Sequence, residues 1–298
     1  MYKDKLIIGT ANFGLDYGIK NKKKLKDEEI FDILQFAYTK DIFGIDTARA
    51  YGNAEQIIGK FFKQYGKVFS VITKITKKAY KSAKDVEDEI CESLKNMNID
   101  YIDFVLFHSY ETYKCYGKVI IDVLSSLCKD KIIGQYGVSV YHPYEIEDIT
   151  LTLKDVNLAI EFPLNIFDQR FLKKLNLRKF KDKGHFLFAR SIFLQGLFFL
   201  DEKILINKFA KAKNKIRKLR QISKEYNIKT ECIALLFTAE KSYIDGVIVG
   251  VDSKEQLMNN VTCFSKESLD KYKLIEPLLT ELAIYDEKII LPYKWGIN

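Results

Sequence analysis

Phe104-Val105-Leu106-Phe107 is an uninterrupted apolar run, and His108 stands directly after it. A strand with one face in water alternates apolar and polar residues, whereas a strand covered on both faces is apolar throughout. Other short β-rich runs, several of them equally apolar, are spaced along the 298 residues. We therefore predict eight buried strands, at residues 5–9, 43–47, 69–74, 102–107, 134–139, 158–162, 185–190 and 246–249.

Helical patterns separate these runs. Apolar residues at helical spacing predict helices over 27–40, 83–97, 119–129 and 210–226. Alternating strands and helices favour a parallel sheet, and eight strands over this length favour its closure into an α/β fold, the (β/α)8 TIM barrel. The main alternative, a doubly wound sheet, should place the motif GxGxxG after an early strand. Residues 9–14 contain glycines but lack that motif.

The composition supports a folded chain with a large core. Hydrophobic residues make up 47% and charged residues 30%, which is not the composition of a disordered chain. Because only 4 prolines are present and no linker-like stretch interrupts the chain, we expect a single domain over residues 1–298. The first apolar run is too short for a signal sequence or a membrane span, so we expect a cytoplasmic protein without membrane contact.

The net charge and the cysteines limit the class of partner. The net charge of +8 could indicate a nucleic-acid partner, but the lysines are spread through the chain and mixed with acids, which is typical of a solvated surface. Such a charge can help to attract anionic ligands. The five cysteines are scattered, odd in number and without a CxxC pair. We therefore expect reduced thiols and neither a disulfide framework nor a zinc site.

Four polar residues follow three successive predicted strands. Asp46 ends the second strand, Tyr51 lies in the loop after it, Lys74 ends the third strand and His108 follows the fourth. In a (β/α)8 barrel the chemistry sits at the carboxyl ends of the strands, and consecutive strands are neighbours. We therefore expect the four side chains to converge. Taken singly, each has a simpler explanation, such as an ion pair between Asp46 and Arg49.

The chemistry of this set is coherent. A free tyrosine has a pKa of about 10, and a nearby ammonium such as that of Lys74 favours the phenolate. Asp46 would hold Lys74 charged and in place, so that Tyr51 can act as a general acid or base. His108, as a neutral imidazole, would orient a substrate carbonyl. A proton donor without a metal or nucleophile suits hydride transfer from a nicotinamide.

The sequence around these residues resembles the aldo-keto reductase family. GIDTARAYGNAE at 44–55 is similar to its signature GxDTAxxYGxxE, and 89–108 resembles its SLxxLxxDYIDLxxxH segment. Residues 137–139 resemble its GVS motif, and 247–260 its terminal cofactor loop. The resemblance implies the barrel, an NADPH or NADH cofactor across the barrel mouth, and catalysis by Asp46, Tyr51, Lys74 and His108. Many relatives carry an N-terminal hairpin, which is missing or very short here.

The resemblance also implies a set of cofactor-binding positions. Ser139 would bond the nicotinamide carboxamide, and Asn260 would lie near the adenine. The whole set is Ser139, Glu161, Arg190, Ser191, Leu194, Gly196, Gly250, Ser253, Lys254, Gln256, Asn259 and Asn260.

Several of these positions depart from the family pattern. Val140 stands where Asn is frequent, Glu161 where Gln is found, and Arg190 where an aromatic residue often stacks on the nicotinamide. Gly250 and Gln256 replace basic residues that contact the 2′-phosphate, but Ser253 and Lys254 can compensate at a predicted helix start. NADPH is therefore favoured over NADH.

The resemblance implies that the substrate is a small carbonyl compound. Candidate contacts come from the loops after the strands, with the alternative that some of these residues are core: Phe13, Tyr17, Tyr110, Phe162, Asn165, Phe167 and Phe193. The segments 162–170 and 190–196 are similar to reductases of surface-polysaccharide and modified-sugar synthesis, which suggests a keto-sugar and a role in carbohydrate metabolism. The competing hypothesis is a cofactor-binding regulatory or accessory subunit with little turnover. The sequence predicts no oligomeric state.

Overall fold

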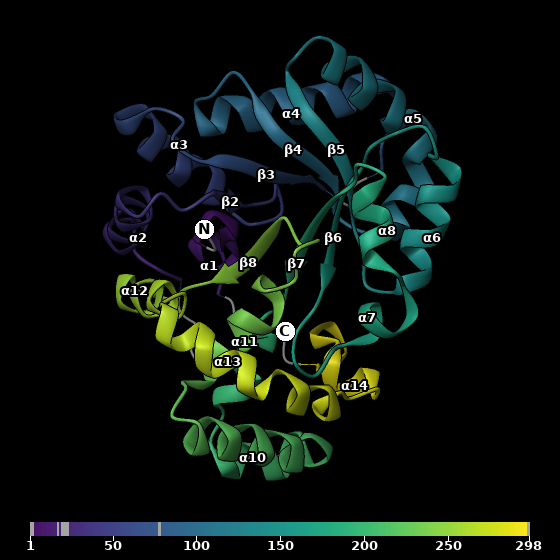
Figure 1. Cartoon of the computed structure of the whole chain (residues 1–298). Helices are drawn as coiled ribbons and strands as arrows, with labels where there is room; N and C mark the ends of the chain where they lie inside the picture. The colour runs from purple at the N-terminus through teal and green to yellow at the C-terminus, as the bar shows by residue number, and fades with distance from the viewer. Residues whose placement is uncertain (1–2, 17, 19–23, 77–78, 297–298) are drawn as a thin grey trace.

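The computed structural model describes residues 3–16, 18, 24–76 and 79–296. Eight parallel strands close into a barrel in chain order, and the last strand pairs with the first (Figure 1). The strands are β1 (Leu6–Gly9), β2 (Gly44–Asp46), β3 (Ser70–Ile75), β4 (Ile102–Phe107), β5 (Ile133–Ser139), β6 (Ala159–Pro163), β7 (Phe186–Arg190) and β8 (Gly246–Gly250). The predicted (β/α)8 TIM barrel is therefore confirmed, and each strand end lies within one residue of its predicted place.

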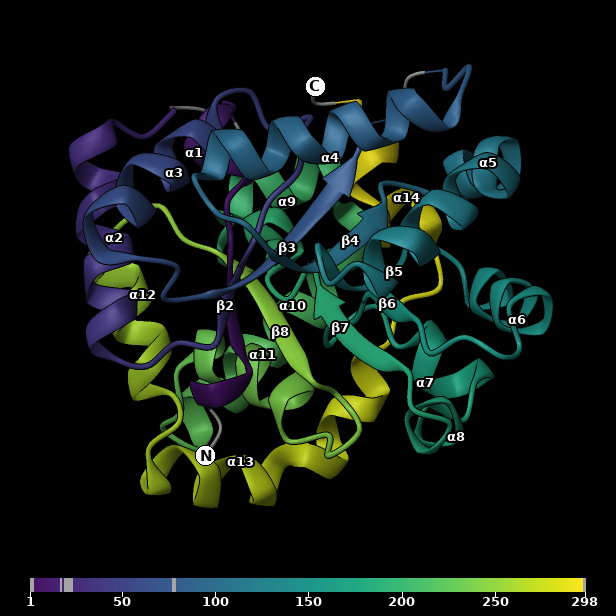
Figure 2. The ribbon, with the colours of Figure 1, turned by 90° about the horizontal axis from the view of Figure 1, so that it is seen from above.

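Helices surround the strands, as the view from above shows (Figure 2). They are α1 (Ala11–Gly14), α2 (Asp27–Thr39), α3 (Ala54–Tyr65), α4 (Ala83–Met97), α5 (Tyr110–Lys129), α6 (Pro143–Thr152), α7 (Arg170–Lys174), α8 (Leu177–Asp182), α9 (Glu202–Lys208), α10 (Ala210–Glu225), α11 (Thr230–Ala239), α12 (Lys254–Thr262), α13 (Lys266–Leu279) and α14 (Glu287–Ile290). Within the described ranges, no helix has the length and apolar character that a membrane span requires.

Helix α5 begins nine residues before its predicted start at residue 119. The Ser109 hydroxyl accepts a hydrogen bond from the backbone N–H of Thr112 at 3.2 Å and so caps the helix. Its first half contains Gly117 and several polar residues, which interrupt the apolar stripe that the prediction followed. The cap, and not the stripe, therefore marks where this helix begins.

The barrel interior explains why the strands are apolar throughout. Successive side chains of a strand point to opposite faces, so that each strand fills both the barrel and the layer under the helices. Ile72, Phe104, Leu106 and Phe188 belong to the inner cluster, together with residues such as Ile7 and Ile248. Their strand neighbours, among them Val71 and Val105, belong to the outer cluster beneath the helices.

Aromatic side chains close the lower part of the barrel. The Phe104 ring lies 5.2 Å from that of Phe186 and 4.9 Å from that of Phe188, both in edge-to-face contact. Before β1, described residues 3–5 form a single 3-10 turn, Lys3–Lys5, and no hairpin. The Lys5 ammonium donates to the carbonyls of Ala239 (3.0 Å) and Lys241 (3.1 Å), which ties this turn to the loop before β8.

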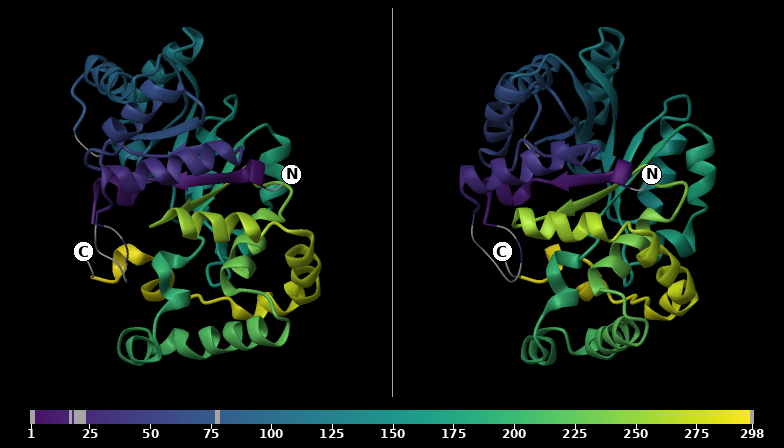
Figure 3. Two further views of the ribbon diagram at one scale, coloured as in Figure 1. Left: turned by 90° about the vertical axis from the view of Figure 1, so that its left-hand side faces the viewer. Right: turned by 60° about the vertical axis from the view of Figure 1, so that its left-hand side comes forward.

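The C-terminal part of the chain returns to the carboxyl ends of the strands. In Figure 3 the β1 arrowhead points to the side on which the yellow residues around α14 lie. The backbone N–H of Ile284 donates to the carbonyl of Phe167 at 2.8 Å, and the Tyr293 ring packs on Tyr141 with centroids 4.7 Å apart. Helix α14 and the turn after it thus cover part of the barrel mouth near β5 and β6.

The cysteine prediction needs correction. Cys232 in α11 and Cys263 at the end of α12 form a disulfide, with Cα atoms 4.8 Å apart. The two are separated by 31 positions in the sequence, and the odd total gave no indication of a pair. Cys91, Cys115 and Cys128 are free thiols, as expected.

Candidate active site

A polar layer lies directly above the apolar barrel interior. Because strand side chains alternate, a residue two positions after an inward-facing residue also points inward, one layer nearer the barrel mouth. The inner-cluster residues that this rule starts from are Ile72, Leu106, Ala159 and Phe188, and they are followed by Lys74, His108, Glu161 and Arg190. Asp46 and Ser139 stand at the corresponding ends of β2 and β5, two residues after glycines. Six strand ends therefore bring titratable or hydrogen-bonding groups into one small region.

Lys74 is the centre of this layer. Its side chain is only 2% exposed, and its ammonium donates to the Asp46 carboxylate and lies 3.4 Å from the carbonyl oxygen of Thr47. A second carboxylate oxygen, Oε2 of Glu161, lies 3.1 Å from the same ammonium. A buried ammonium is stable only when it is paired, and here two strands on opposite sides of the barrel each supply a partner.

The electrostatics of the Asp46–Lys74 pair follow from this burial. Burial alone would lower the pKa of Lys74, but the carboxylates of Asp46 and Glu161 outweigh it, so the pKa is raised and the ammonium stays charged. Burial raises the pKa of Asp46 to about 7, because the attraction of Lys74 offsets this only in part and Glu161 repels the second negative charge. The pKa of Glu161 is lowered: burial opposes ionisation, but Lys74 and Arg190 prevail.

Tyr51 reaches this layer from the loop between β2 and α3. Two glycines fix the loop: a Cβ at Gly14 would lie 1.7 Å from the Tyr51 carbonyl oxygen, and Gly52, with φ +57°, packs against Gly14. The Lys74 ammonium lies 5.7 Å from the centroid of the Tyr51 ring. The His108 ring lies edge-on to the same ring, with centroids 6.0 Å apart. The structure thus brings the four predicted catalytic side chains together.

The alternative partner for Asp46 is engaged elsewhere. Arg49 forms ion pairs with Glu55 at 2.9 Å and with Glu92 at 2.6 Å. Glu55 also accepts a hydrogen bond from the Thr73 hydroxyl at 2.9 Å, which links α3 to the outer face of β3. These contacts hold the Tyr51 loop from outside the barrel. Asp46 therefore pairs with Lys74 and not with Arg49.

Glu161 and Arg190 form a pair that sequence reasoning missed. The Arg190 Nε lies 3.0 Å from Oε1 of Glu161, and the Ser139 hydroxyl donates to the same oxygen at 2.9 Å. The guanidinium also donates to the Val140 carbonyl at 2.9 Å and lies 4.2 Å above the centroid of the Tyr141 ring. The period of two could have revealed the contact with Lys74, because it places Glu161 two residues after the inward-facing Ala159.

The loop after β7 has an unusual backbone. Ser191, Leu194 and Gln195 have φ values of 61°, 48° and 51°, and Gly196 follows with φ 89°. Non-glycine residues rarely adopt left-handed conformations, and clusters of them occur in loops that bind ligands. The three predicted cofactor positions in this loop are thus held in one strained turn, in which the Leu194 side chain is buried and Ser191 and Gly196 are partly exposed.

The remaining predicted cofactor positions lie around the start of α12. The Ser253 hydroxyl accepts from the backbone N–H of Gln256 at 3.2 Å and caps the helix. Gly250, Lys254 and Gln256 are exposed, Asn259 is half-buried and Asn260 is 4% exposed. The Asn12 amide, which sequence reasoning did not consider, donates to the carbonyl of Val251 at 2.6 Å and to Asp252 Oδ1 at 3.0 Å, and so joins α1 to this loop.

The predicted substrate residues differ in exposure. Phe13, Phe162, Asn165 and Phe167 have no exposed surface, which favours the alternative that they belong to the core, and a role in substrate contact stays a prediction. Asn165 accepts from the backbone N–H groups of Phe167 and Asp168, at 3.0 and 2.9 Å, and shapes the loop after β6. Phe193 and Tyr110 are partly exposed, and the Tyr110 hydroxyl donates to Asp148 at 2.9 Å. Tyr17 lies outside the described residues.

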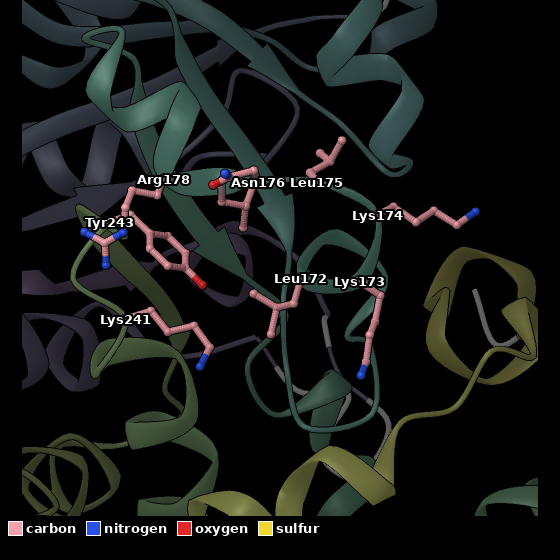
Figure 4. A pocket seen from close by; sticks show the side chains of 9 residues that line it. Leu172, Lys173, Lys174, Leu175, Asn176, Arg178, Lys241 and Tyr243 are labelled. Carbon is pink, nitrogen blue, oxygen red and sulfur yellow. The ribbon is translucent and has the colours of Figure 1, made fainter.

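A pocket of about 690 Å³ lies away from this layer (Figure 4). Its lining consists of Leu172, Lys173, Lys174, Leu175, Asn176, Leu177, Arg178, Lys241 and Tyr243. None of the four predicted catalytic residues lines it. The candidate active site therefore rests on the geometry of the strand ends and not on this cavity.

Comparison with known sequences follows the geometry. Residues 5–276 match the sequence pattern of the Aldo/keto reductase family. This match spans all eight strands, from Lys5 at the start of the barrel to a point within α13. A search among curated proteins finds no match.

Solved structures share the fold at low identity. An aldo-keto reductase from Bacillus halodurans, in its holo form, is 20% identical with a TM-score of 0.73, covering 95% of this chain and 94% of that chain. A glycerol dehydrogenase from Gluconobacter oxydans is 18% identical with a TM-score of 0.73, covering 96% of this chain and 92% of that chain. At these identities the likeness shows the fold alone.

Proposed function

This chain belongs to the aldo/keto reductase family, and we propose that Tyr51 is the proton donor with which it reduces a small-molecule carbonyl. Membership makes the chain an oxidoreductase and implies NAD(P)H-dependent carbonyl reduction. The observation that carries the proposal is the contact between the buried, doubly paired Lys74 ammonium and the ring of Tyr51, at 5.7 Å from its centroid.

The proposed roles divide the proton transfer among four residues. Lys74 favours the phenolate of Tyr51, so the phenol releases its proton to the carbonyl oxygen more readily than a free tyrosine would. Asp46 keeps Lys74 charged and positioned. His108, edge-on to Tyr51, would donate a hydrogen bond to the same carbonyl oxygen and so fix its orientation. In the oxidation direction Tyr51 would take the proton back as the base.

The residues present fit a nicotinamide cofactor. When bound, the nicotinamide supplies the hydride. Ser139 and Glu161 present a hydroxyl and a carboxylate beside Lys74, and both are buried. The left-handed turn at 191–196 and the start of α12 offer backbone and side-chain groups for the phosphates. A buried amide oxygen of Asn12, beside the loop after β8, has no hydrogen-bond partner among the described residues, which suits a ligand in that loop.

We favour NADPH over NADH as the cofactor. Lys254 is the first residue of α12, directly after the Ser253 cap, so its ammonium and the helix N-terminus can act on the same anion. Gly250 and Gln256 provide no positive charge, which keeps NADH as the alternative. For the substrate we propose a keto-sugar or a related sugar derivative, in keeping with the family resemblance of the segments 162–170 and 190–196.

The test is the Tyr51→Phe variant. Loss of the phenol should reduce kcat by a factor on the order of 10² to 10⁴, the usual contribution of general acid catalysis, while cofactor affinity stays unchanged. A panel of aldehydes and ketosugars with NADPH provides the assay, and cofactor fluorescence measures binding. Tyr136→Phe is the matched control, because it removes a buried hydroxyl that bonds Ser125 at 2.9 Å on the outer face of β5.

The possible results separate the hypotheses. Full activity in Tyr51→Phe would refute the assigned proton donor. Tight cofactor binding by the unaltered protein without turnover of any substrate in the panel would instead favour the regulatory or accessory subunit.

A further inference from the structure

We infer that Glu161 is a second counter-ion of Lys74, and that Glu161 and Arg190 together set the pH at which Tyr51 exchanges its proton. The inference rests on the proposed function, because it takes Tyr51 to be the proton donor. It adds that Glu161 and Arg190 control the pH at which Tyr51 ionises, which the four proposed catalytic residues alone do not determine. Both are positioning residues that act through Lys74.

The contact between Glu161 and Lys74 is buried and direct. Oε2 of Glu161 lies 3.1 Å from the Lys74 ammonium, and both side chains are 2% exposed. Charges are poorly screened at such burial, so a carboxylate at this distance acts strongly on the ammonium. Lys74 therefore divides its attraction between two carboxylates, Asp46 and Glu161, and its net effect on Tyr51 is weaker than that of an ammonium with a single partner.

Arg190 opposes this weakening. Its Nε lies 3.0 Å from the other oxygen of Glu161, where the Ser139 hydroxyl also donates. The guanidinium is held from two more sides, by the Val140 carbonyl and the face of Tyr141. Arg190 thus neutralises part of the Glu161 charge without contacting Lys74, and its fixed position makes that effect constant.

Two acidic and two basic side chains meet in this layer. Asp46 from β2 and Glu161 from β6 are the acids, Lys74 from β3 and Arg190 from β7 are the bases, and Tyr51 and His108 complete the surroundings. The Lys74 ammonium lies 5.7 Å from the centroid of the Tyr51 ring, so a charge on one group acts on the other in this poorly solvated layer. Removing one acid or one base from this set should move the ionisation of Tyr51 in opposite directions.

Two changes of charge test this. Glu161→Gln can keep the acceptor for Ser139 and Arg190 but removes the negative charge, so Tyr51 should ionise at a lower pH, by on the order of one pH unit. Arg190→Gln can keep a donor to Glu161 but removes the positive charge, so Tyr51 should ionise at a higher pH. The double variant should return towards the unaltered protein. A merely structural role would not produce shifts of opposite sign.

The readout does not depend on turnover. The ultraviolet absorbance of each cofactor-free variant is titrated with pH. The curve of the same variant carrying Tyr51→Phe in addition is then subtracted, and the difference isolates the phenolate signal of Tyr51. The pH profile of kcat then gives a second reading: the alkaline fall of the reduction should move with the titration. Glu145→Gln is the control, because this buried carboxylate caps α6 through the backbone N–H groups of Tyr141 and His142 and does not contact Lys74.

The outcomes separate this inference from the proposed function. Opposite shifts for Glu161→Gln and Arg190→Gln, with none for Glu145→Gln, would support the inference. Unchanged titrations, or shifts of the same sign, in a protein whose activity still depends on Tyr51 would overturn it and leave the proposed function standing. Full activity in Tyr51→Phe would remove both.

Discussion

The two sides of the barrel mouth differ in how closely they follow the family pattern. The tetrad side, at the ends of β2 to β4, carries Asp46, Tyr51, Lys74 and His108 in the order that the signature implies. The cofactor side, at the ends of β5 to β8, departs from the pattern at Val140, Glu161 and Arg190, and again around α12. The side proposed for proton transfer is thus regular, and the side proposed to hold the cofactor is altered.

The structure shows that two of the departures belong together. Glu161 in place of Gln would leave an extra buried charge, and Arg190 in place of an aromatic residue would introduce a second one. Their contact at 3.0 Å lets each neutralise the other, and Tyr141 supplies an aromatic face for the guanidinium. A change on the cofactor side is therefore compensated within that side, and its remaining effect reaches the tetrad side through Lys74.

The largest effect should come from breaking the tetrad side at Lys74. Lys74→Met should abolish the Tyr51-dependent rate and also destabilise the fold by about 3–5 kcal/mol, because Asp46 and Glu161 lose the cation that they share in the interior. Denaturant unfolding measures the second effect. An unfolding free energy within about 0.5 kcal/mol of that of the unaltered protein, the usual range for surface substitutions, would mean that the pairing contributes little.

An intermediate effect should appear when the cofactor side is returned to the family pattern. Arg190→Phe alone leaves the Glu161 carboxylate without its guanidinium partner. Glu161→Gln alone leaves Arg190 without a carboxylate and replaces the carboxylate beside Lys74 with a neutral amide. In a double-mutant cycle the two changes should show a coupling free energy of about 1–3 kcal/mol, with the double variant more stable than the sum of the single effects predicts. Strict additivity in thermal or denaturant unfolding would contradict the view that they form one unit.

The smallest effect should be at the exposed start of α12. Lys254→Ala should weaken NADPH binding about fivefold, which corresponds to about 1 kcal/mol for an exposed charge contact, and leave NADH binding unchanged. The contrast should shrink as salt rises, because exposed charges are screened. Lys266→Ala, at the start of the neighbouring helix α13, is a suitable control. Equal losses for both cofactors would place the 2′-phosphate elsewhere.

Much of the fold and the tetrad could be predicted because both depend on local sequence pattern. Continuous apolar runs marked the strands, and the strand ends in chain order placed Asp46, Lys74 and His108 at one rim. The pairing of Glu161 with Arg190 could not be predicted in this way. It joins β6 to β7, and the sequence of either strand taken alone does not indicate the partner. The Cys232–Cys263 disulfide was missed for the same reason, since it depends on how α11 packs against α12.

Burial of side chains in the segments after the strands was also difficult to predict. Phe13, in α1, and Phe167 follow strands, where ligand contacts are common, yet both are fully buried. The segment after β6 folds back on the barrel, where Phe167 packs against Phe198 with ring centroids 4.8 Å apart. Sequence position gives the end of the barrel at which a residue lies, whereas the direction of its side chain depends on loop packing that no periodic pattern describes.

A crystal structure with bound NADPH tests the central claim most directly. The account predicts that the nicotinamide lies at the barrel mouth between the two sides, within reach of Ser139 and Glu161 on one and facing Tyr51 and His108 on the other. A nicotinamide bound outside the barrel mouth, or a structure in which Tyr51 turns away from Lys74 once the cofactor is present, would contradict it.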